Sequence, residues 1–181
     1  MFKYVVLAAL FLLNSCLSPD EINVTADPDA VELDHFLRQA LQLSENQELV
    51  KSVQLDQSTE SKKIPVDSTT LKKDLKGLLD YSFKRLIRSS NYNKTQKDHK
   101  VIFERKPTEK NGPLTLIISK NESGLIDGLE AEFKNENYLY KSSQWISLRF
   151  ETGNLVHYKV EGVRKLIGLE QSNFLIEASI E

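Results

Sequence analysis

The second half of the chain repeats a pattern of alternating apolar and polar residues. In residues 145–150 the apolar side chains occupy every second position, as in a strand with one buried and one partly wet face. Turn-forming clusters such as 135–137 and 152–154 separate the runs, and such short links join antiparallel neighbours. The strand-length runs are 101–105, 114–119, 125–133, 138–141, 145–150, 155–163 and 174–180. We therefore expect a mainly antiparallel meander sheet.

The first half has two segments with helical spacing. Asp27 followed by Pro28 has the form of an N-cap, and apolar residues then recur every three or four positions, which predicts a helix over 28–43. A second helix is predicted from Asp67 or Ser68 to about residue 89. Its apolar stripe consists of Leu71, Leu75, Leu78, Leu79, Ser82 and Leu86. Gly77 inside this helix indicates close packing or local weakness.

Residues 49–55 and 62–66 are rich in β-branched residues and flank the turn-prone segment 56–59, which predicts a hairpin. The expected fold class is therefore α+β: two helices and a β-hairpin packed on the meander sheet. These elements would form a single domain over residues 28–181.

The amino-terminal segment predicts a targeting signal rather than an element of the fold. Lys3 precedes an apolar run over residues 5–13, and the chain's one cysteine, Cys16, follows Ser15. The run is shorter than the roughly 20 residues needed to span a bilayer. Residues 1–15 resemble the signal peptide of a bacterial lipoprotein. This resemblance implies that Cys16 carries a diacylglycerol thioether and acyl chains such as palmitate. The alternatives are a secretory signal cut after Ser18, or a buried helix start with an idle thiol.

Residues 16–27 predict an acidic tether between the anchor and the domain. From Leu17 to Asp34 there are six acidic residues and no lysine or arginine, and Pro19 and Pro28 disfavour regular structure. A solvated linker is one interpretation of this composition. The other is a surface-export signal, because Asp20 and Glu21 partly resemble the acidic signal of some Bacteroidota lipoproteins.

Composition excludes several functional classes. Removing 15 of 181 residues leaves 166, enough for a core without disulfide or metal support. The net charge of the full chain is −2, so a nucleic-acid partner is not expected. With Cys16 acylated, the domain would have no thiol for a metal site or for catalysis.

Motifs for catalysis, cofactors and metals are missing from the sequence. His35, His99 and His157 lie far apart and form no His-x-x-x-His pair. The sequence contains no Gly-x-Ser-x-Gly elbow and no glycine-rich phosphate loop. Glu130 and Glu132 share one face of a predicted strand, where solvent exposure is the simpler explanation. We therefore expect no enzymatic activity, no cofactor and no metal.

Two weaker patterns each have two interpretations. Four aromatic residues in predicted strands could form an exposed patch for a partner or glycan, or could serve core and cross-strand packing: Tyr138, Tyr140, Trp145 and Tyr158. The segment Asp67-Ser68-Thr69 resembles an acceptor for Bacteroidota O-glycosylation, but it also suits a helix cap.

The order of elements resembles that of uncharacterised Bacteroidota lipoproteins. The resemblance rests on residues 33–37, 62–64, 71–75 and 90–92, and it implies no known activity. Leu17 lacks the aspartate that retains some lipoproteins at the inner membrane, so resemblance favours the outer membrane, on its periplasmic or surface face.

Three functions follow as expectations. The first is a lipid-anchored, non-enzymatic binding or scaffold module with an envelope protein as partner. The alternative is a carrier of a lipid or other apolar ligand in a cavity between sheet and helices. A hydrolase with an unfamiliar site is the third.

Overall fold

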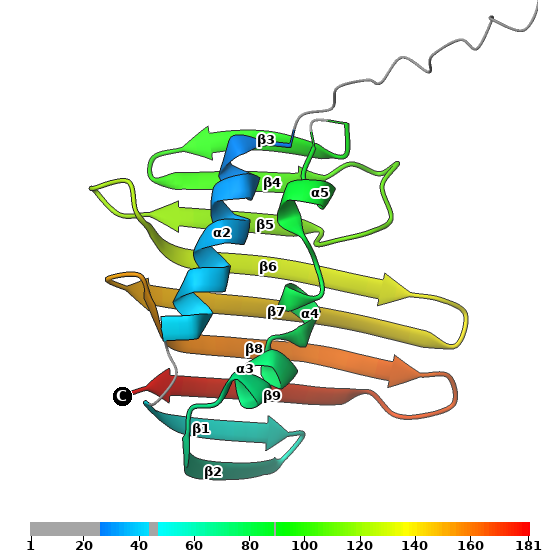
Figure 1. The fold of residues 1–181 in the computed structure, drawn as a ribbon. Helices are drawn as coiled ribbons and strands as arrows, with labels where there is room; N and C mark the ends of the chain where they lie inside the picture. The colour runs from blue at the N-terminus through cyan, green and yellow to red at the C-terminus, as the bar shows by residue number, and fades with distance from the viewer. Residues whose placement is uncertain (1–25, 44–46, 89) are drawn as a thin grey trace, which may run out of the picture.

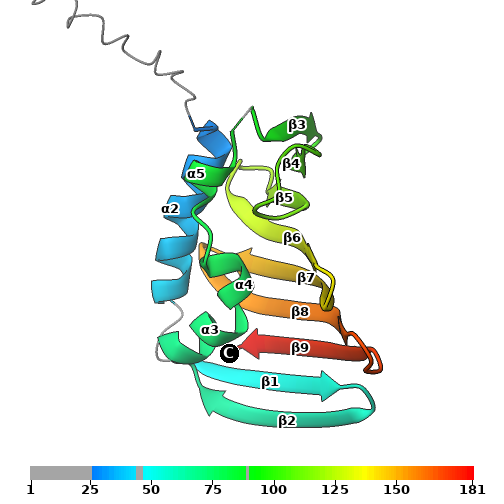
Figure 2. The same cartoon turned by 90° about the vertical axis from the view of Figure 1, so that its right-hand side faces the viewer.

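The domain is a single antiparallel sheet covered on one face by helices. The computed structural model describes residues 26–43, 47–88 and 90–181. Figures 1 and 2 show all the described helices on the same side of the sheet. The predicted signal peptide, Cys16 and residues 16–25 of the predicted tether lie outside the described residues.

Over the described residues, the sheet has nine strands in the order β2-β1-β9-β8-β7-β6-β5-β4-β3. The described helices are α2 (Pro28–Leu43), α3 (Ser68–Asp74), α4 (Lys76–Leu79) and α5 (Phe83–Leu86). The strands are β1 (Glu48–Leu55), β2 (Ser58–Pro65), β3 (Tyr92–Lys97), β4 (Lys100–Arg105), β5 (Thr115–Lys120), β6 (Ile126–Glu136), β7 (Tyr140–Glu151), β8 (Asn154–Leu166) and β9 (Ser172–Ile180). Strands β3 to β9 form the meander, and β1 pairs with β9.

The sheet dominates the α+β fold more than the sequence predicted. The predicted hairpin does not pack on the sheet but extends it, because β1 pairs with β9 over residues 49–55. The predicted runs 138–141 and 145–150 belong largely to one strand, β7. Strand β3 was not predicted, because it is a polar edge strand with only Tyr92 buried. Polar edge strands discourage pairing with further chains, so their sequences lack the alternation on which the prediction relied.

Helix α2 has the predicted bounds, and its N-cap is confirmed by the hydrogen bond from Asp29 N to Asp27 Oδ1 (3.0 Å). The predicted second helix was wrong in its continuity: it is three short helices, α3, α4 and α5. Asp67 caps α3 by accepting from Thr70 N (2.7 Å). The chain leaves helical geometry at Leu75 (φ −95°, ψ 12°) and again at Ser82 (φ −101°, ψ 102°).

One apolar core joins the helices to the sheet. The predicted stripe on the second helical segment contributes Leu71, Leu75 and Leu78, which are almost completely buried. They belong to one cluster with apolar residues of α2 and alternate residues of the strands, including Ile146, Leu148, Phe150, Tyr158 and Val160. The face predicted for residues 146, 148 and 150 is therefore confirmed as core, as is the packing role of Tyr158.

The amino-terminal end of α2 is tied to the sheet by charge. Lys94 on β3 contacts the carboxylates of Asp27 (2.9 Å) and Asp29 (2.6 Å). Lys120 on β5 contacts Asp29 (3.0 Å) and Glu32 (2.8 Å). Asp27, the last residue of the predicted tether, therefore already contacts the folded domain.

We predict that the stripe leucines carry much of the stability. Leu75→Ala should reduce the free energy of unfolding by about 2–5 kcal/mol, because it leaves a cavity in a closely packed core. Lys73→Ala, on an exposed position of α3, should cost less than about 0.5 kcal/mol. Chemical denaturation measures both, and a near-neutral Leu75→Ala would contradict the packed core.

We also predict that the Asp29 cluster stabilises the fold in a pH-dependent way. Burial opposes ionisation of Asp29, but the hydrogen bonds and charges of Lys94 and Lys120 lower its pKa below the ordinary 3.8. The folded state therefore binds this proton less readily than the unfolded chain. The stabilisation should be complete above about pH 4 and lost as the pH falls through the lowered pKa.

Denaturation of Asp29→Asn against the parent chain, at neutral and acidic pH, tests this linkage. The variant should be less stable at neutral pH, and the difference should shrink in acid. Glu122→Gln, in the exposed turn between β5 and β6, is the control and should show no such dependence. A difference for Asp29→Asn that does not change with pH would refute the linkage.

Candidate functional site

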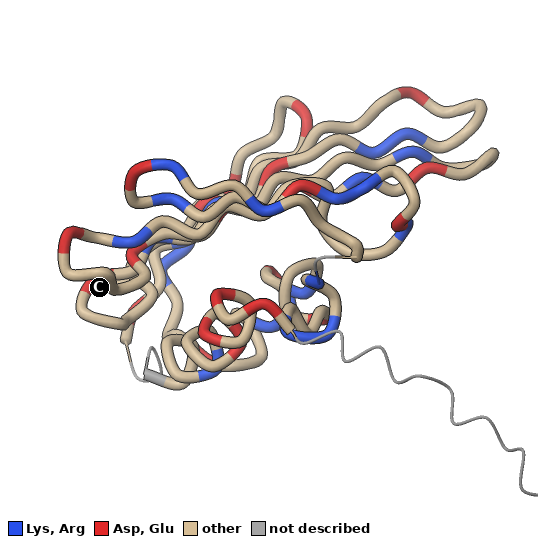
Figure 3. The backbone as a smooth tube through the Cα atoms, turned by 90° about the horizontal axis from the view of Figure 1, so that it is seen from above, with Lys and Arg blue, Asp and Glu red and all other residues tan. Residues whose placement is uncertain are grey.

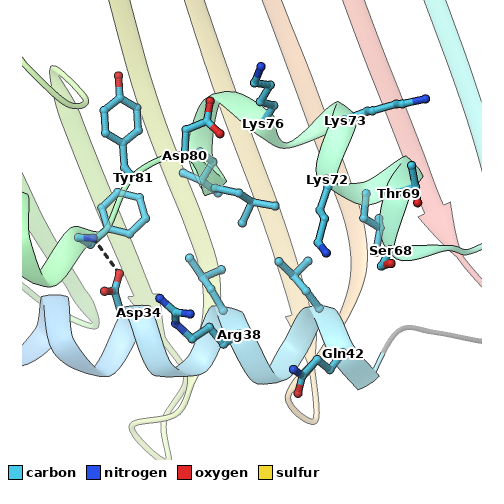
Figure 4. A pocket seen from close by; sticks show the side chains of 16 residues that line it. Asp34, Arg38, Gln42, Ser68, Thr69, Lys72, Lys73, Lys76, Asp80 and Tyr81 are labelled. Atoms are coloured by element: carbon cyan, nitrogen blue, oxygen red, sulfur yellow. Dashed lines mark hydrogen bonds between the residues drawn. The ribbon is translucent and has the colours of Figure 1, made fainter.

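A groove of about 740 Å³ runs through the helical layer, between α2 and the segment from α3 to α5. Figure 4 shows the two walls, with α2 on one side and α3 and α4 on the other. We call it the helical groove; its lining residues are Asp34, Leu37, Arg38, Leu41, Gln42, Ser68, Thr69, Leu71, Lys72, Lys73, Lys76, Leu78, Leu79, Asp80, Tyr81 and Phe83. Its volume lies in the range of about 300–1,000 Å³ typical of small-molecule sites.

The breaks in the second helical segment shape this groove. Gly77 lies so close to β7 that a Cβ atom there would lie 2.9 Å from Gln144 Oε1. The sequence left close packing and local weakness as alternatives for Gly77, and the close approach agrees with the first. Tyr81, which follows α4, stacks on Phe133 of β6 with ring centroids 5.4 Å apart. The segment thus follows the sheet closely as short helices instead of forming one straight helix.

Asp34 fixes one end of the groove by joining α2 to α5. Its side chain is buried, with 8% of the residue exposed. Oδ1 accepts a hydrogen bond from Phe83 N (2.8 Å), and Oδ2 accepts one from Ser82 Oγ (3.0 Å). The bond to Phe83 N satisfies an N–H at the start of α5 that the side chain of the N-cap residue, Ser82, does not bind.

Asp74 fixes the other wall by joining α3 to the sheet. Tyr158 Oη on β8 donates to Asp74 Oδ2 (2.6 Å), and Lys51 Nζ on β1 lies 2.6 Å from the same carboxylate. Burial and the neighbouring Asp74 raise the pKa of Tyr158 far above its ordinary value of 10, so its hydroxyl stays protonated as a donor. Sequence reasoning missed the roles of both Asp34 and Asp74, because their partners lie 23 to 84 residues away.

The base of the groove is apolar. Leu37, Leu71, Leu78 and Phe83 are buried in the core, and Leu41 and Leu79 pack against it while remaining partly exposed. A ligand in the groove would therefore contact the two partly exposed leucines over a buried apolar layer.

The polar lining of the groove is mostly cationic. Among the described residues, none of Arg38, Lys72, Lys73 and Lys76 forms an ion pair with a carboxylate, whereas Asp34 uses both its oxygens in hydrogen bonds. Figure 4 shows Lys72 directed towards α2 and Arg38 on the facing wall, while Lys73 and Lys76 point away. Within the described part of the chain, the two cations between the walls, Arg38 and Lys72, therefore form no ion pair, and Asp80 is the second carboxylate of the lining.

The residues that the sequence singled out do not meet in a site. His35 and His99 are exposed, and His157 lies 3.2 Å from Glu177 on the sheet. Glu130 and Glu132 are half-buried on the helix-free face. Over residues 26–43, 47–88 and 90–181, no group of three or more histidine, cysteine or acidic residues could hold a metal. Of the four aromatic residues, Tyr138 is exposed and Tyr158 is fully buried.

Comparison with known proteins assigns no family to this chain. The sequence matches no protein-family model and no curated protein. In the part of the chain that the structure describes, no helix has the length and apolar character needed to cross a bilayer.

Proposed function

We propose that this protein is a lipid-anchored cell-envelope binding module whose helical groove holds an anionic amphiphile, such as a fatty acid. In this proposal Cys16 carries the lipid anchor, the location is the outer membrane, and the activity is binding without catalysis. The ligand of the predicted carrier is retained, but its site is the groove within the helical layer rather than a cavity between helices and sheet.

The observation that carries the proposal is the combination of an apolar base with cations that form no ion pair among the described residues. Leu41 and Leu79 offer partly exposed apolar surface, and Arg38 and Lys72 offer positive charge from opposite walls. Pockets of this kind bury the apolar part of a ligand and orient it through a few charged groups. A carboxylate or phosphate head group would pair with the cations, and Arg38 can bind it through two parallel hydrogen bonds.

The size of the groove supports a small molecule over a protein segment. A helix with its side chains is about 10–12 Å wide, so even two turns of it need more than the groove's 740 Å³. An envelope protein partner, the other predicted occupant, would therefore have to bind elsewhere.

The chemistry of the lining supports binding over catalysis. Arginine remains charged and cannot exchange a proton, and Asp34 already accepts two hydrogen bonds within the fold. The cations of the groove therefore supply charge and position, and Asp34 is not free to act as a general base for an activated nucleophile.

We predict that the full chain binds cis-parinaric acid, a fluorescent fatty acid, in a saturable way. Lys72→Ala should weaken binding about tenfold, because a charge-assisted hydrogen bond contributes about 1.5–3 kcal/mol and one tenfold step is 1.4 kcal/mol. Lys84→Ala is the matched control: it removes the same charge from an exposed position of α5 that does not line the groove. Fluorescence titration measures both.

Two results would refute the groove as the site. One is equal weakening by Lys72→Ala and Lys84→Ala, which would indicate a non-specific effect of net charge. The other is equally tight binding of the methyl ester of the probe, which has no anionic group. A variant with Leu41→Asp should lose binding with little change in the folding transition, because Leu41 is partly exposed.

A further inference from the structure

Five large apolar side chains are exposed on two turns at one end of the sheet. Tyr138 and Leu139, between β6 and β7, are 85% and 47% exposed. Leu166, Ile167 and Leu169, at the end of β8 and in the turn to β9, are 48%, 69% and 62% exposed. We call these five residues the apolar tips. Contiguous exposed apolar groups of this kind usually mark a contact surface.

The two turns are neighbours. Tyr140 pairs with Leu166 in the register of β7 and β8, and Ile167 N donates to Leu139 O (2.9 Å). Figures 1 and 2 both place the β6–β7 and β8–β9 turns at the same end of the sheet. The apolar tips therefore form one surface rather than two separate features.

Several backbone groups of the tips are paired within the two turns. Asn137 Oδ1 accepts hydrogen bonds from Leu139 N (2.9 Å) and Tyr140 N (2.8 Å), and Asn137 N donates to Tyr140 O (2.8 Å). Leu169 N donates to Leu166 O (3.1 Å). Unpaired backbone groups are costly in an apolar medium, so this pairing lowers the cost of moving the turns from water into such a medium.

Cations surround the tips. Residues 134–141 and 164–171 contain Lys134, Lys141, Arg164 and Lys165 against Glu136 and Glu170. Glu136 is bound by both Lys134 and Lys141. The surface thus has a net charge of +2 in a chain whose overall net charge is −2, and it would be attracted to anionic lipid head groups.

We propose that the apolar tips insert shallowly into the head-group region of an anionic bilayer and orient the anchored domain on it. Tyrosine favours this region, where its ring is in apolar surroundings and its hydroxyl remains wet. Five residues are also few compared with the roughly 20–30 that each partner contributes to a standard protein interface. This inference rests on the membrane location proposed above, but not on the ligand of the helical groove.

An environment-sensitive dye tests the insertion. The full chain with Ile167→Cys is labelled with a nitrobenzoxadiazole dye and reconstituted in phosphatidylcholine vesicles with and without phosphatidylglycerol. Ser123→Cys, in the exposed turn between β5 and β6, is the control. The emission of the dye at position 167 should shift to the blue, more strongly with phosphatidylglycerol. The dye at position 123 should keep its solvent-like emission. Solvent-like emission at both positions, or equal shifts, would overturn the proposal.

Substitutions elsewhere on the two turns give a second test. With the dye at position 167, Leu169→Ser should lower the fraction of inserted dye at least threefold. Leu125→Ser, which removes a leucine of similar exposure (64%) from the β5–β6 turn, should have no effect. Equal effects would contradict the proposal.

Dye stoichiometry reports the anchor separately, because an unacylated Cys16 takes a second label. Binding of cis-parinaric acid should be unchanged in Leu169→Ser, so failure of the groove and of the tips can be distinguished.

Discussion

Two aspartates with little exposure hold the helical layer against the sheet. Asp34 binds the start of α5, and Asp74 binds Tyr158 and Lys51. The helices that they position are only four to seven residues long, too short to be stable in isolation. The hydrogen bonds and ion pair of these carboxylates therefore hold the short helices in place, as the backbone of one long helix would have done. The two walls of the helical groove depend on this arrangement.

The groove exists because the second helical segment is interrupted. Breaks at Leu75 and Ser82 let the chain follow the sheet, and close contact between Gly77 and Gln144 brings α4 near β7. Figure 3 shows the helical layer and the sheet from above, as two separate layers. Since the polar edge strands β2 and β3 discourage strand addition, the surfaces left for recognition in our proposal are the helical groove and the apolar tips.

The features that depend on local sequence were predictable. Alternation located most strands, and the Asp27 cap and the spacing of apolar residues gave the bounds of α2. The apolar stripe identified Leu71, Leu75 and Leu78 as core. Strand β3 was missed because an edge strand needs no alternation. The helix breaks were missed because the stripe residues are buried whether the segment is one helix or three.

The candidate site was not predictable, because it depends on long-range partners. Asp34 was grouped with the acidic residues that follow Cys16, and nothing near it in sequence indicates that Phe83 N would need an acceptor. Likewise, Lys72 and Lys73 are equivalent in the sequence pattern, and only the packing of α3 directs Lys72 towards α2. The apolar tips were visible only in part, through Tyr138, because exposure of Leu139 and Ile167 depends on how the two turns meet.

The most direct test of this account is the distance between α2 and α5, with and without the Asp34 carboxylate. Spin labels at Gln39→Cys and Lys84→Cys, both exposed positions, are placed in a Cys16→Ser background and measured by pulsed electron paramagnetic resonance. The account predicts one narrow distance distribution that broadens clearly in Asp34→Ala, while thermal denaturation still shows a folded domain. A broad distribution with Asp34 intact, or a distribution that stays narrow in Asp34→Ala, would contradict it.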